Sequence, residues 1–243
     1  MKNMLKLKGV TKTFGALKAV DNVSININEG EIVGLIGPNG SGKTTLFNII
    51  TGVLYPDHGM IEFKERNITK LPPFKRCRLG ISRVHQIPRP FLKMTVFENI
   101  VTAYLYGGGG SRAKARSEVI KLLEFVGLTG KEDMPTHFLN LYERKLVEIA
   151  RSLATGCKLL LLDEPLAGLN PAEIEKAVNM IRKIRDDFDI TVFWVEHIMG
   201  AIKKAAERVI VLNQGKKIAE GSFEEIANNE EVVAAYLGER YVF

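Results

Sequence analysis

A glycine-rich segment between an apolar run and a helical pattern limits the folds open to this chain more than any other feature. Residues 37–44 read Gly-Pro-Asn-Gly-Ser-Gly-Lys-Thr and match the P-loop template of Gly, four residues and Gly-Lys-Thr. The apolar run at residues 32–36 is typical of a buried parallel strand, and residues 45–50 continue as a helix that stops at Gly52. The motif requires this order of strand, loop and helix, so the sequence predicts an α/β fold with a phosphate site at the loop.

The residue types of the loop explain how it would hold a phosphate. Glycines permit positive φ angles, which lets consecutive N–H groups point inward, and the following helix adds its N-terminal donors. Lys43 is expected to bridge the β- and γ-phosphates, and the Thr44 hydroxyl to ligate Mg²⁺. The alternative, a glycine turn followed by a solvated lysine, does not explain the flanking strand and helix. The nucleotide-binding residues predicted in the loop are Gly37, Pro38, Asn39, Gly40, Ser41, Gly42, Lys43, Thr44 and Thr45.

A second motif follows a second apolar run. Residues 159–162 are four leucines, and Asp163 and Glu164 come directly after them. In open α/β folds, ligands bind at the carboxyl edge of the sheet, where such a strand would deliver this acidic pair. Asp163 is expected to hold Mg²⁺ through a water molecule, and Glu164 to orient or deprotonate the attacking water. A helix cap or a solvated loop is the alternative, but a metal ion beside the P-loop explains the charge.

With these motifs the chain resembles the ATP-binding-cassette ATPases over nearly its whole length. Gln86 lies where the family has its Q-loop glutamine, His197 where it has its switch histidine, and Phe14 where an aromatic residue stacks on adenine. Taken singly, each has a plainer interpretation as a structural or core residue, but their order and spacing favour the functional one. The resemblance implies ATP and Mg²⁺ as cofactors, Glu164, His197 and Gln86 as catalytic residues, and Thr44, Gln86 and Asp163 as metal ligands.

The alternation of strands and helices predicts the architecture. We expect a P-loop NTPase fold of the α/β class, with a mostly parallel sheet, an antiparallel β edge subdomain and an inserted helical subdomain. The helical subdomain is placed at residues 87–155, where helical periodicity replaces the strand pattern. The catalytic core with its antiparallel part takes residues 1–86 and 156–221, and C-terminal helices take residues 222–243. We expect all 243 residues to form one nucleotide-binding domain.

Local patterns place the elements around these motifs. Thr95 and Glu98 form a capping box that starts a helix through Tyr104, and Asn170 caps a later helix. The other expected features are two antiparallel strands joined at Phe14 and Gly15, a strand at residues 81–86, a flexible glycine linker at residues 107–111 and a helical tail at residues 222–237.

One segment departs from the family pattern. The family completes each ATP site with a Leu-Ser-Gly-Gly-Gln signature at a helix N-terminus of the facing monomer, where small residues let the γ-phosphate reach the helix N–H groups. The corresponding residues here are Leu139, Asn140, Leu141, Tyr142 and Glu143. Tyr142 adds bulk and Glu143 a negative charge, although Asn140 could still donate a hydrogen bond. The D-loop aspartate of the family is replaced by Asn170. We therefore expect this signature to serve the facing site poorly, which favours a heterodimer with an intact partner signature.

Single-cassette chains of this size resemble the motor subunits of transporters. Residues 91–100 and 232–239 further resemble the cassette subunits of branched-chain amino-acid importers, and a similar ending occurs in the cassette of the lipopolysaccharide-export machine. The resemblance implies an ATPase that works with transmembrane permease subunits and a second cassette, as a homo- or heterodimer. Two alternatives remain open, namely a catalytically weak partner cassette of a heterodimeric transporter and the cassette of a lipopolysaccharide exporter.

Composition limits the remaining classes of function and partner. The net charge of +6 is spread thinly, and no zinc-finger or aromatic RNA-binding signature accompanies the basic cluster at residues 75–78, so we expect no nucleic-acid partner. No apolar run approaches the roughly 20 residues that span a bilayer. Cys77 and Cys157 lack metal-site spacing and suit a reducing cytosol. These features predict a cytoplasmic protein, and the resemblance to transporter subunits implies that it is peripheral at the inner face of the cell membrane. A metabolic P-loop kinase would not explain Gln86 or His197.

Overall fold

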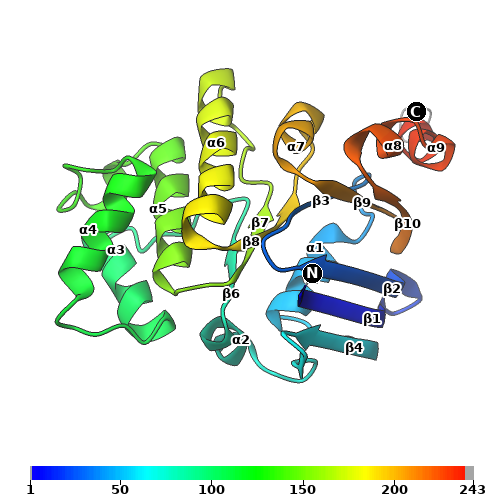
Figure 1. Cartoon of the computed structure of the whole chain (residues 1–243), viewed down its shortest axis with the longest axis horizontal. Coiled ribbons are helices and arrows are strands. Elements are labelled where there is room, and N and C mark those ends of the chain that lie inside the picture. Colours follow the sequence, from blue (N-terminus) through cyan, green and yellow to red (C-terminus); the bar gives the residue numbers. More distant parts are fainter. Residues whose placement is uncertain (1, 239–243) are drawn as a thin grey trace.

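Two β-sheets form the centre of the computed structural model, which describes residues 2–238 (Figure 1). The smaller sheet is antiparallel and has the strand order β2 (Leu17–Asn28), β1 (Asn3–Phe14), β4 (His58–Phe63) and β5 (Arg66–Asn67). The larger sheet has the order β10 (Lys216–Gly221), β9 (Arg208–Asn213), β3 (Ile32–Ile36), β8 (Thr191–Val195), β7 (Leu159–Asp163) and β6 (Ile81–Val84). Its neighbouring strands run parallel except for the β9–β10 hairpin. The predicted fold class is confirmed.

Helices cover the larger sheet and extend beyond it at one end (Figure 1). In chain order they are α1 (Lys43–Thr51), α2 (Pro73–Leu79), α3 (Val96–Thr102), α4 (Ala115–Val126), α5 (Leu141–Ala154), α6 (Pro171–Phe188), α7 (Met199–Ala205), α8 (Phe223–Ala227) and α9 (Glu230–Gly238).

The central strands divide the hydrophobic core into two parts. Every residue of β3, β7 and β8 is buried, as expected for parallel strands covered on both faces. Successive side chains of a strand point to opposite faces. In β7, Leu159 and Leu161 pack with α1 and the smaller sheet, whereas Leu160 and Leu162 pack with the helices of the other face. The helix that follows the P-loop is therefore fixed by apolar contacts to both sheets.

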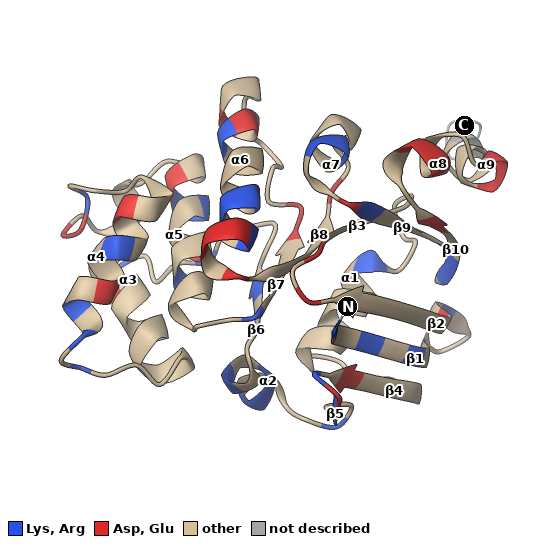
Figure 2. Ribbon diagram, viewed as in Figure 1, with Lys and Arg blue, Asp and Glu red and all other residues tan. Residues whose placement is uncertain are grey.

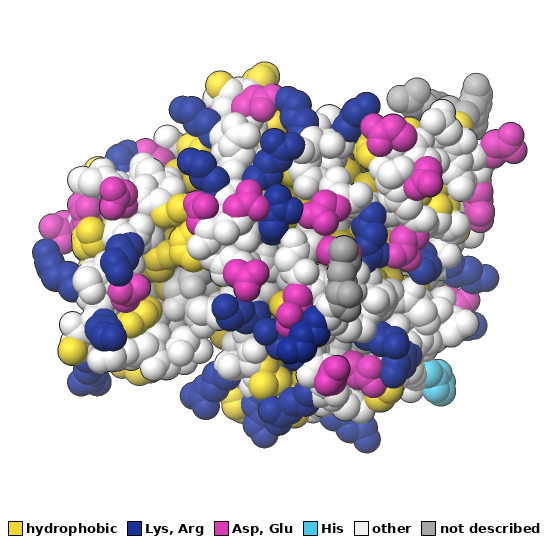
Figure 3. Space-filling view, viewed as in Figure 1, with side chains coloured by type: hydrophobic (Ala, Val, Ile, Leu, Met, Phe, Trp, Pro, Cys, Tyr) yellow, Lys and Arg dark blue, Asp and Glu magenta, His cyan; other side chains and the backbone are white. Residues whose placement is uncertain are grey.

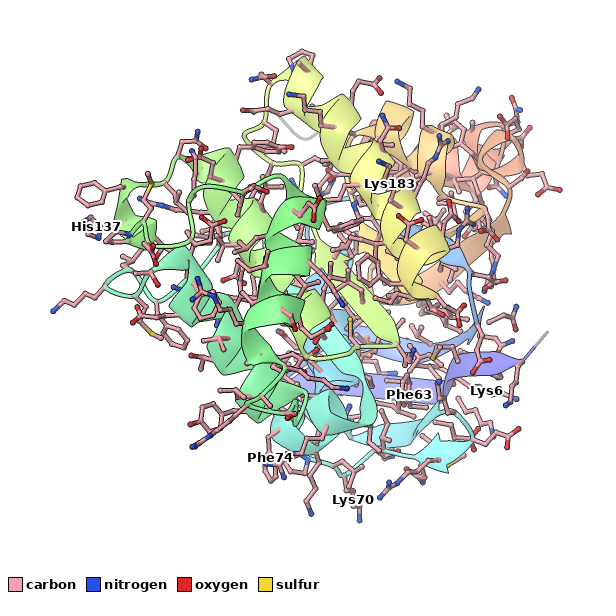
Figure 4. The ribbon with its side chains drawn as sticks, turned by 60° about the vertical axis from the view of Figure 1, so that its left-hand side comes forward. Lys6, Phe63, Lys70, Phe74, His137 and Lys183 are labelled. Atoms are coloured by element: carbon pink, nitrogen blue, oxygen red, sulfur yellow. The ribbon has the colours of Figure 1, made fainter. Side chains whose placement is uncertain are left out.

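The helices α3, α4 and α5 lie together at one end of the molecule, between β6 and β7 in the chain (Figure 1). The capping box at Thr95 is confirmed, because its hydroxyl accepts from the Glu98 N–H at 3.1 Å and the Glu98 carboxylate accepts from the Thr95 N–H at 2.8 Å. His137, in the turn before α5, lies at the outer edge of this helical block (Figure 4). Residues 87–155 remain the extent that we propose for the helical subdomain.

Three local predictions need correction. The strand β6 ends at Val84 and not at residue 86, because the chain leaves the sheet before Gln86. The helix α3 ends at Thr102, and a π-helical turn follows it. The glycines of residues 107–111 form a packed turn in place of a flexible linker: the Gly110 N–H donates to the Tyr104 carbonyl at 2.9 Å, and a Cβ on Gly110 would lie 2.2 Å from the Tyr104 ring.

The C-terminal tail is helical, as predicted, but it is divided into α8 and α9. Ser222 caps α8 in a capping box with Glu225, and the Asn229 side chain accepts from the Val232 N–H at 3.1 Å at the start of α9. Polar side chains that compete for backbone groups favour such helix ends over helix interiors. Residues 239–243, the end of the segment assigned to C-terminal helices, lie outside the described residues.

Charged residues of both signs are distributed over the elements (Figure 2), and their side chains are interspersed on the face seen in Figure 3. Between residues 2 and 238, no helix is both long and apolar enough to cross a membrane.

Candidate functional site

A cavity of about 650 Å³ lies over the P-loop. Residues of the loop form one wall, the β1–β2 turn forms another, and Glu164 and Gln214 complete the lining. Lys43 and Thr44 thus share one cavity with Glu164, although more than a hundred residues separate them in the chain. The residues that line it are Phe14, Leu17, Lys18, Ala19, Asn39, Gly40, Ser41, Gly42, Lys43, Thr44, Thr45, Glu164 and Gln214.

Neighbouring strands hold the loop in place. Gly37 directly follows β3 and has a φ angle of 150°; a Cβ there would lie 2.1 Å from the carbonyl oxygen of Leu212 in β9. Only glycine permits so close an approach of two backbones. The tip of the β9–β10 hairpin adds a hydrogen bond of 3.0 Å from the Gly215 N–H to the Ser41 carbonyl. The loop is therefore preformed by the sheet and the hairpin.

Lys43 begins α1 and is buried, with 6% of its surface exposed. Its ammonium donates to the carbonyl oxygens of Gly37 and Pro38 at 2.7 and 2.8 Å, and to the Ser41 hydroxyl at 3.3 Å. These contacts keep a positive charge within the loop, where the sequence places a phosphate.

Glu164 is the residue that brings the predicted catalytic side chains together. It follows β7 with a φ angle of 48°, a left-handed conformation that is uncommon for a residue other than glycine. Its N–H donates to the Val195 carbonyl at 2.9 Å, which fixes it beside β8. Its carboxylate accepts from Gln86 Nε2 at 2.6 Å and lies 2.9 Å from His197 Nε2. The three predicted catalytic residues therefore form one hydrogen-bonded group, which we call the hydrolytic trio.

Asp163 is buried at the end of β7, and its carboxylate forms an ion pair with Arg83 of β6. The same guanidinium donates from Nη1 to the Asn48 side chain of α1 at 2.6 Å. Arg83 therefore connects the acidic strand end to the helix of the P-loop. We did not predict this role, although a charged residue inside a run of strand-forming residues was a signal for it.

The donor types at this edge suit Mg²⁺, which prefers oxygen ligands in octahedral geometry and commonly takes one or two carboxylates with substrate phosphates and water. Thr44 and Asp163 would supply a hydroxyl and a carboxylate, and Gln86 would supply an amide oxygen. In the part of the chain that the structure describes, no group of three or more His, Cys, Asp or Glu side chains could hold a metal. Phosphate and water oxygens would therefore have to complete the coordination.

Phe14 ends β1 at the entrance of the cavity, and 47% of its surface is exposed. The turn that it begins joins β1 and β2 as predicted, through the pair Phe14 and Leu17. A ring this exposed beside the P-loop is not a core residue, and it offers a flat face to a planar base. The Leu17–Ala19 segment and Gln214 also line the cavity, and no sequence pattern indicated that these two segments would meet there.

Residues 139–143, which differ from the family's signature, lie at the start of α5. Asn140 caps the helix by accepting from the Glu143 N–H at 2.9 Å, and the Glu143 carboxylate accepts in return from the Asn140 N–H at 3.0 Å. Glu143 also forms an ion pair with Lys131, which lowers its pKa against the opposing effect of burial. The charge of Glu143 is thus partly neutralised, and its carboxylate already accepts from the N–H of the N-cap residue Asn140. Tyr142, the residue before Glu143, is half-buried.

The comparisons with known proteins agree with this geometry. Residues 20–167 match the family model for ABC transporters, and residues 216–242 match a model described as branched-chain amino acid ATP-binding cassette transporter. The chain is 38% identical to the high-affinity branched-chain amino acid transport ATP-binding protein LivG of Salmonella typhimurium, over 97% of this chain and 98% of LivG. It is 37% identical to BraF of Pseudomonas aeruginosa over the same shares of both chains.

Solved structures give the same result. The ATP-binding cassette MJ1267 in its ADP conformation has a TM-score of 0.87 and 32% identity, covering 98% of this chain and 100% of that one. A dimeric cassette, MJ0796 bound to ADP and Pi, has a TM-score of 0.81 and 28% identity, covering 90% and 99%. Nucleotide binding, ATPase chemistry and a likeness to importer cassettes are thereby shown together. The chain belongs to the ABC transporter family, among its ATP-hydrolysing, ATP-binding subunits.

Proposed function

We propose that this chain hydrolyses MgATP at the inner face of the membrane and so drives import of branched-chain amino acids through permease subunits. The observation that carries the proposal is the hydrolytic trio, in which Gln86 and His197 hold the carboxylate of Glu164, a residue that lines the P-loop cavity. The names of the relatives LivG and BraF support the choice of branched-chain amino acids over lipopolysaccharide.

The trio suits hydrolysis of the terminal phosphate. The P-loop N–H groups and Lys43 would hold the phosphates, and Phe14 would stack on adenine. Glu164 would take a proton from a water molecule whose oxygen attacks the γ-phosphorus. The bond between the γ-phosphorus and the bridging oxygen breaks, and ADP and inorganic phosphate leave. Thr44, Gln86 and Asp163 would hold Mg²⁺, which neutralises phosphate charge when bound.

The permease would dock in a groove of about 420 Å³ between the core and the helical block. Arg83 and His85 line one side of the groove, and Glu148 and Arg151 of α5 line the other. His85 directly precedes Gln86 in the chain. A permease helix bound in this groove would therefore contact the residue next to a member of the trio. Burial and the nearby Arg83 and Arg89 charges lower the pKa of His85, which leaves it neutral at physiological pH.

The second cassette is proposed to be a different chain. In a dimer each signature helix must present its N-terminal N–H groups to the nucleotide of the partner. Here the Glu143 carboxylate occupies that end of α5 and Tyr142 adds bulk. A homodimer would carry two such ends, whereas a heterodimer would give this chain's own hydrolytic trio an intact partner signature.

Repair of the signature tests this preference for a heterodimer. We expect the double variant Tyr142→Gly with Glu143→Gln to raise the ATP turnover of the purified chain by about tenfold, because it removes the Tyr142 ring and the Glu143 negative charge from the helix end that must face a phosphate. Gln at position 143 can still cap α5. Phosphate release gives the rate, and the double variant Tyr106→Gly with Glu118→Gln is the matched surface control. Unchanged turnover in the repaired chain would show that the signature is not limiting.

Transport itself is tested by uptake. In a strain that lacks the gene for this chain, uptake of radiolabelled leucine, isoleucine and valine should fall to background, and the wild-type gene should restore it. Lys43→Ala should not restore uptake, because it removes the charge that holds the phosphates. Normal uptake of all three amino acids by the deletion strain would refute the proposed substrate class.

A further inference from the structure

A buried pair of oppositely charged residues lies beneath the hydrolytic trio. Lys145 belongs to α5 and is 3% exposed, and Glu196 lies between β8 and α7 and is 2% exposed. Burial lowers the pKa of Lys145, while the Glu196 and Glu164 carboxylates raise it. Burial also raises the pKa of Glu196, against hydrogen bonds from neighbouring N–H groups. Both side chains therefore sit close to the trio.

Lys145 holds the main chain at two members of the trio. Its ammonium donates to the Pro165 carbonyl at 2.8 Å and to the Gln86 carbonyl at 3.4 Å. Pro165 directly follows Glu164, so one buried cation fixes the turn that carries the catalytic carboxylate and the residue that donates to it. Lys145 comes from the helical block, whereas Glu164 comes from the sheet.

Glu196 holds the main chain at His197, the third residue of the hydrolytic trio. Its carboxylate accepts from the His197 N–H at 2.9 Å and from the Leu166 N–H at 3.3 Å. The Leu166 contact is to the same turn that Lys145 holds through Pro165. The two buried side chains thus contact the main chain beside Gln86, Glu164 and His197.

Placing charges in a protein interior is costly, and well-packed apolar residues of similar size are often no less stable. General stability is therefore a weak reason for a buried Lys and Glu at this place. Catalytic groups, in contrast, lose rate steeply when they are displaced by about 1 Å.

We propose that Lys145 and Glu196 are positioning residues for ATP hydrolysis, which fix the main chain of the hydrolytic trio and connect it to the signature helix α5. The proposal rests on the proposed ATPase function. Lys145 lies five residues from Asn140, which is about 7 Å along the helix. If α5 moves when its N-terminus contacts the nucleotide of the facing cassette, Lys145 would therefore pass that movement to the hydrolytic trio of its own chain.

The test is the kinetics of Lys145→Met, which keeps the length of the side chain and removes its charge and donors. We expect kcat of the purified chain to fall by about 30-fold, while KM and the dissociation constant for ATP stay within about twofold, because the P-loop is untouched. Lys121→Met, at an exposed position of α4, is the matched control and should leave kcat unchanged. A kcat of Lys145→Met equal to that of the wild type overturns the proposal.

A second background separates positioning from general destabilisation. In the Gln86→Ala chain the trio is already incomplete, so Lys145→Met should there cost less than about threefold in kcat. An equal loss in both backgrounds would mean that Lys145 supports the fold in general, which also overturns the proposal. If Lys145→Met does not fold, Lys145→Gln keeps an NH₂ donor group without the charge, and the same comparison of the two backgrounds decides. Failure of the wild-type chain to bind or hydrolyse ATP would instead refute the proposed function.

Discussion

Glu164→Gln should lower the rate of ATP hydrolysis by roughly 10³-fold, within the 10²- to 10⁴-fold range of general base catalysis. The amide is nearly the same size as the carboxylate but cannot accept a proton from water. Gln86 and His197 would still be able to hydrogen-bond to it, because both lie within 3 Å of the carboxylate oxygens. The loss should therefore appear in chemistry and not in folding. Phosphate release in a single turnover measures this loss of hydrolysis rate. The same measurement is made in the signature-repaired chain.

Nucleotide binding provides the control for this variant. Glu164→Gln should bind ATP with a dissociation constant within about twofold of the wild type, since Lys43 and the P-loop donors are unchanged. In the signature-repaired chain, Glu164→Gln should also elute as a dimer from a sizing column with ATP and as a monomer with ADP, because the unhydrolysed γ-phosphate stays between the two cassettes. A variant that keeps a tenth or more of the wild-type turnover would exclude Glu164 as the base.

Arg76→Met should lower the free energy of unfolding by about 4 kcal/mol, because it leaves several buried carbonyl groups without a donor, at about 1–3 kcal/mol each. Arg76 of α2 is 1% exposed and donates to the carbonyls of Ile49 and Ile50, at the end of the P-loop helix, at 2.6 and 2.8 Å. It also donates to the carbonyls of Leu71 and Thr69, at 2.8 and 2.9 Å. Burial lowers its pKa to about 10, so the guanidinium stays protonated at neutral pH.

Urea denaturation of the nucleotide-free chain measures this effect, which is a large fraction of the about 5–15 kcal/mol that stabilises a typical domain. Arg78→Met, at an exposed position of the same helix, is the matched control and should change stability by less than about 0.5 kcal/mol. If Arg76→Met unfolds at the same urea concentration as the wild type, Arg76 does not cap the P-loop helix in the way that these contacts indicate.

The sequence by itself determined the fold class and the chemistry of the site. The P-loop and the leucine strand before Asp163 are continuous segments, and their function depends on spacing that can be read along the chain. The capping boxes at Thr95 and Asn170 could be predicted for the same reason, because each joins residues within one helical turn.

Tertiary structure decided the contacts between segments that are distant in the chain. Arg83 pairs with Asp163, Lys131 with Glu143, and Lys145 reaches Pro165, and each pairing depends on how α5 and the strands pack. The turn that carries Gln214 reaches the cavity only because β9 lies beside β3. A sequence pattern states which faces are apolar, but the relative placement of two packed elements is set by side chains that interlock across them.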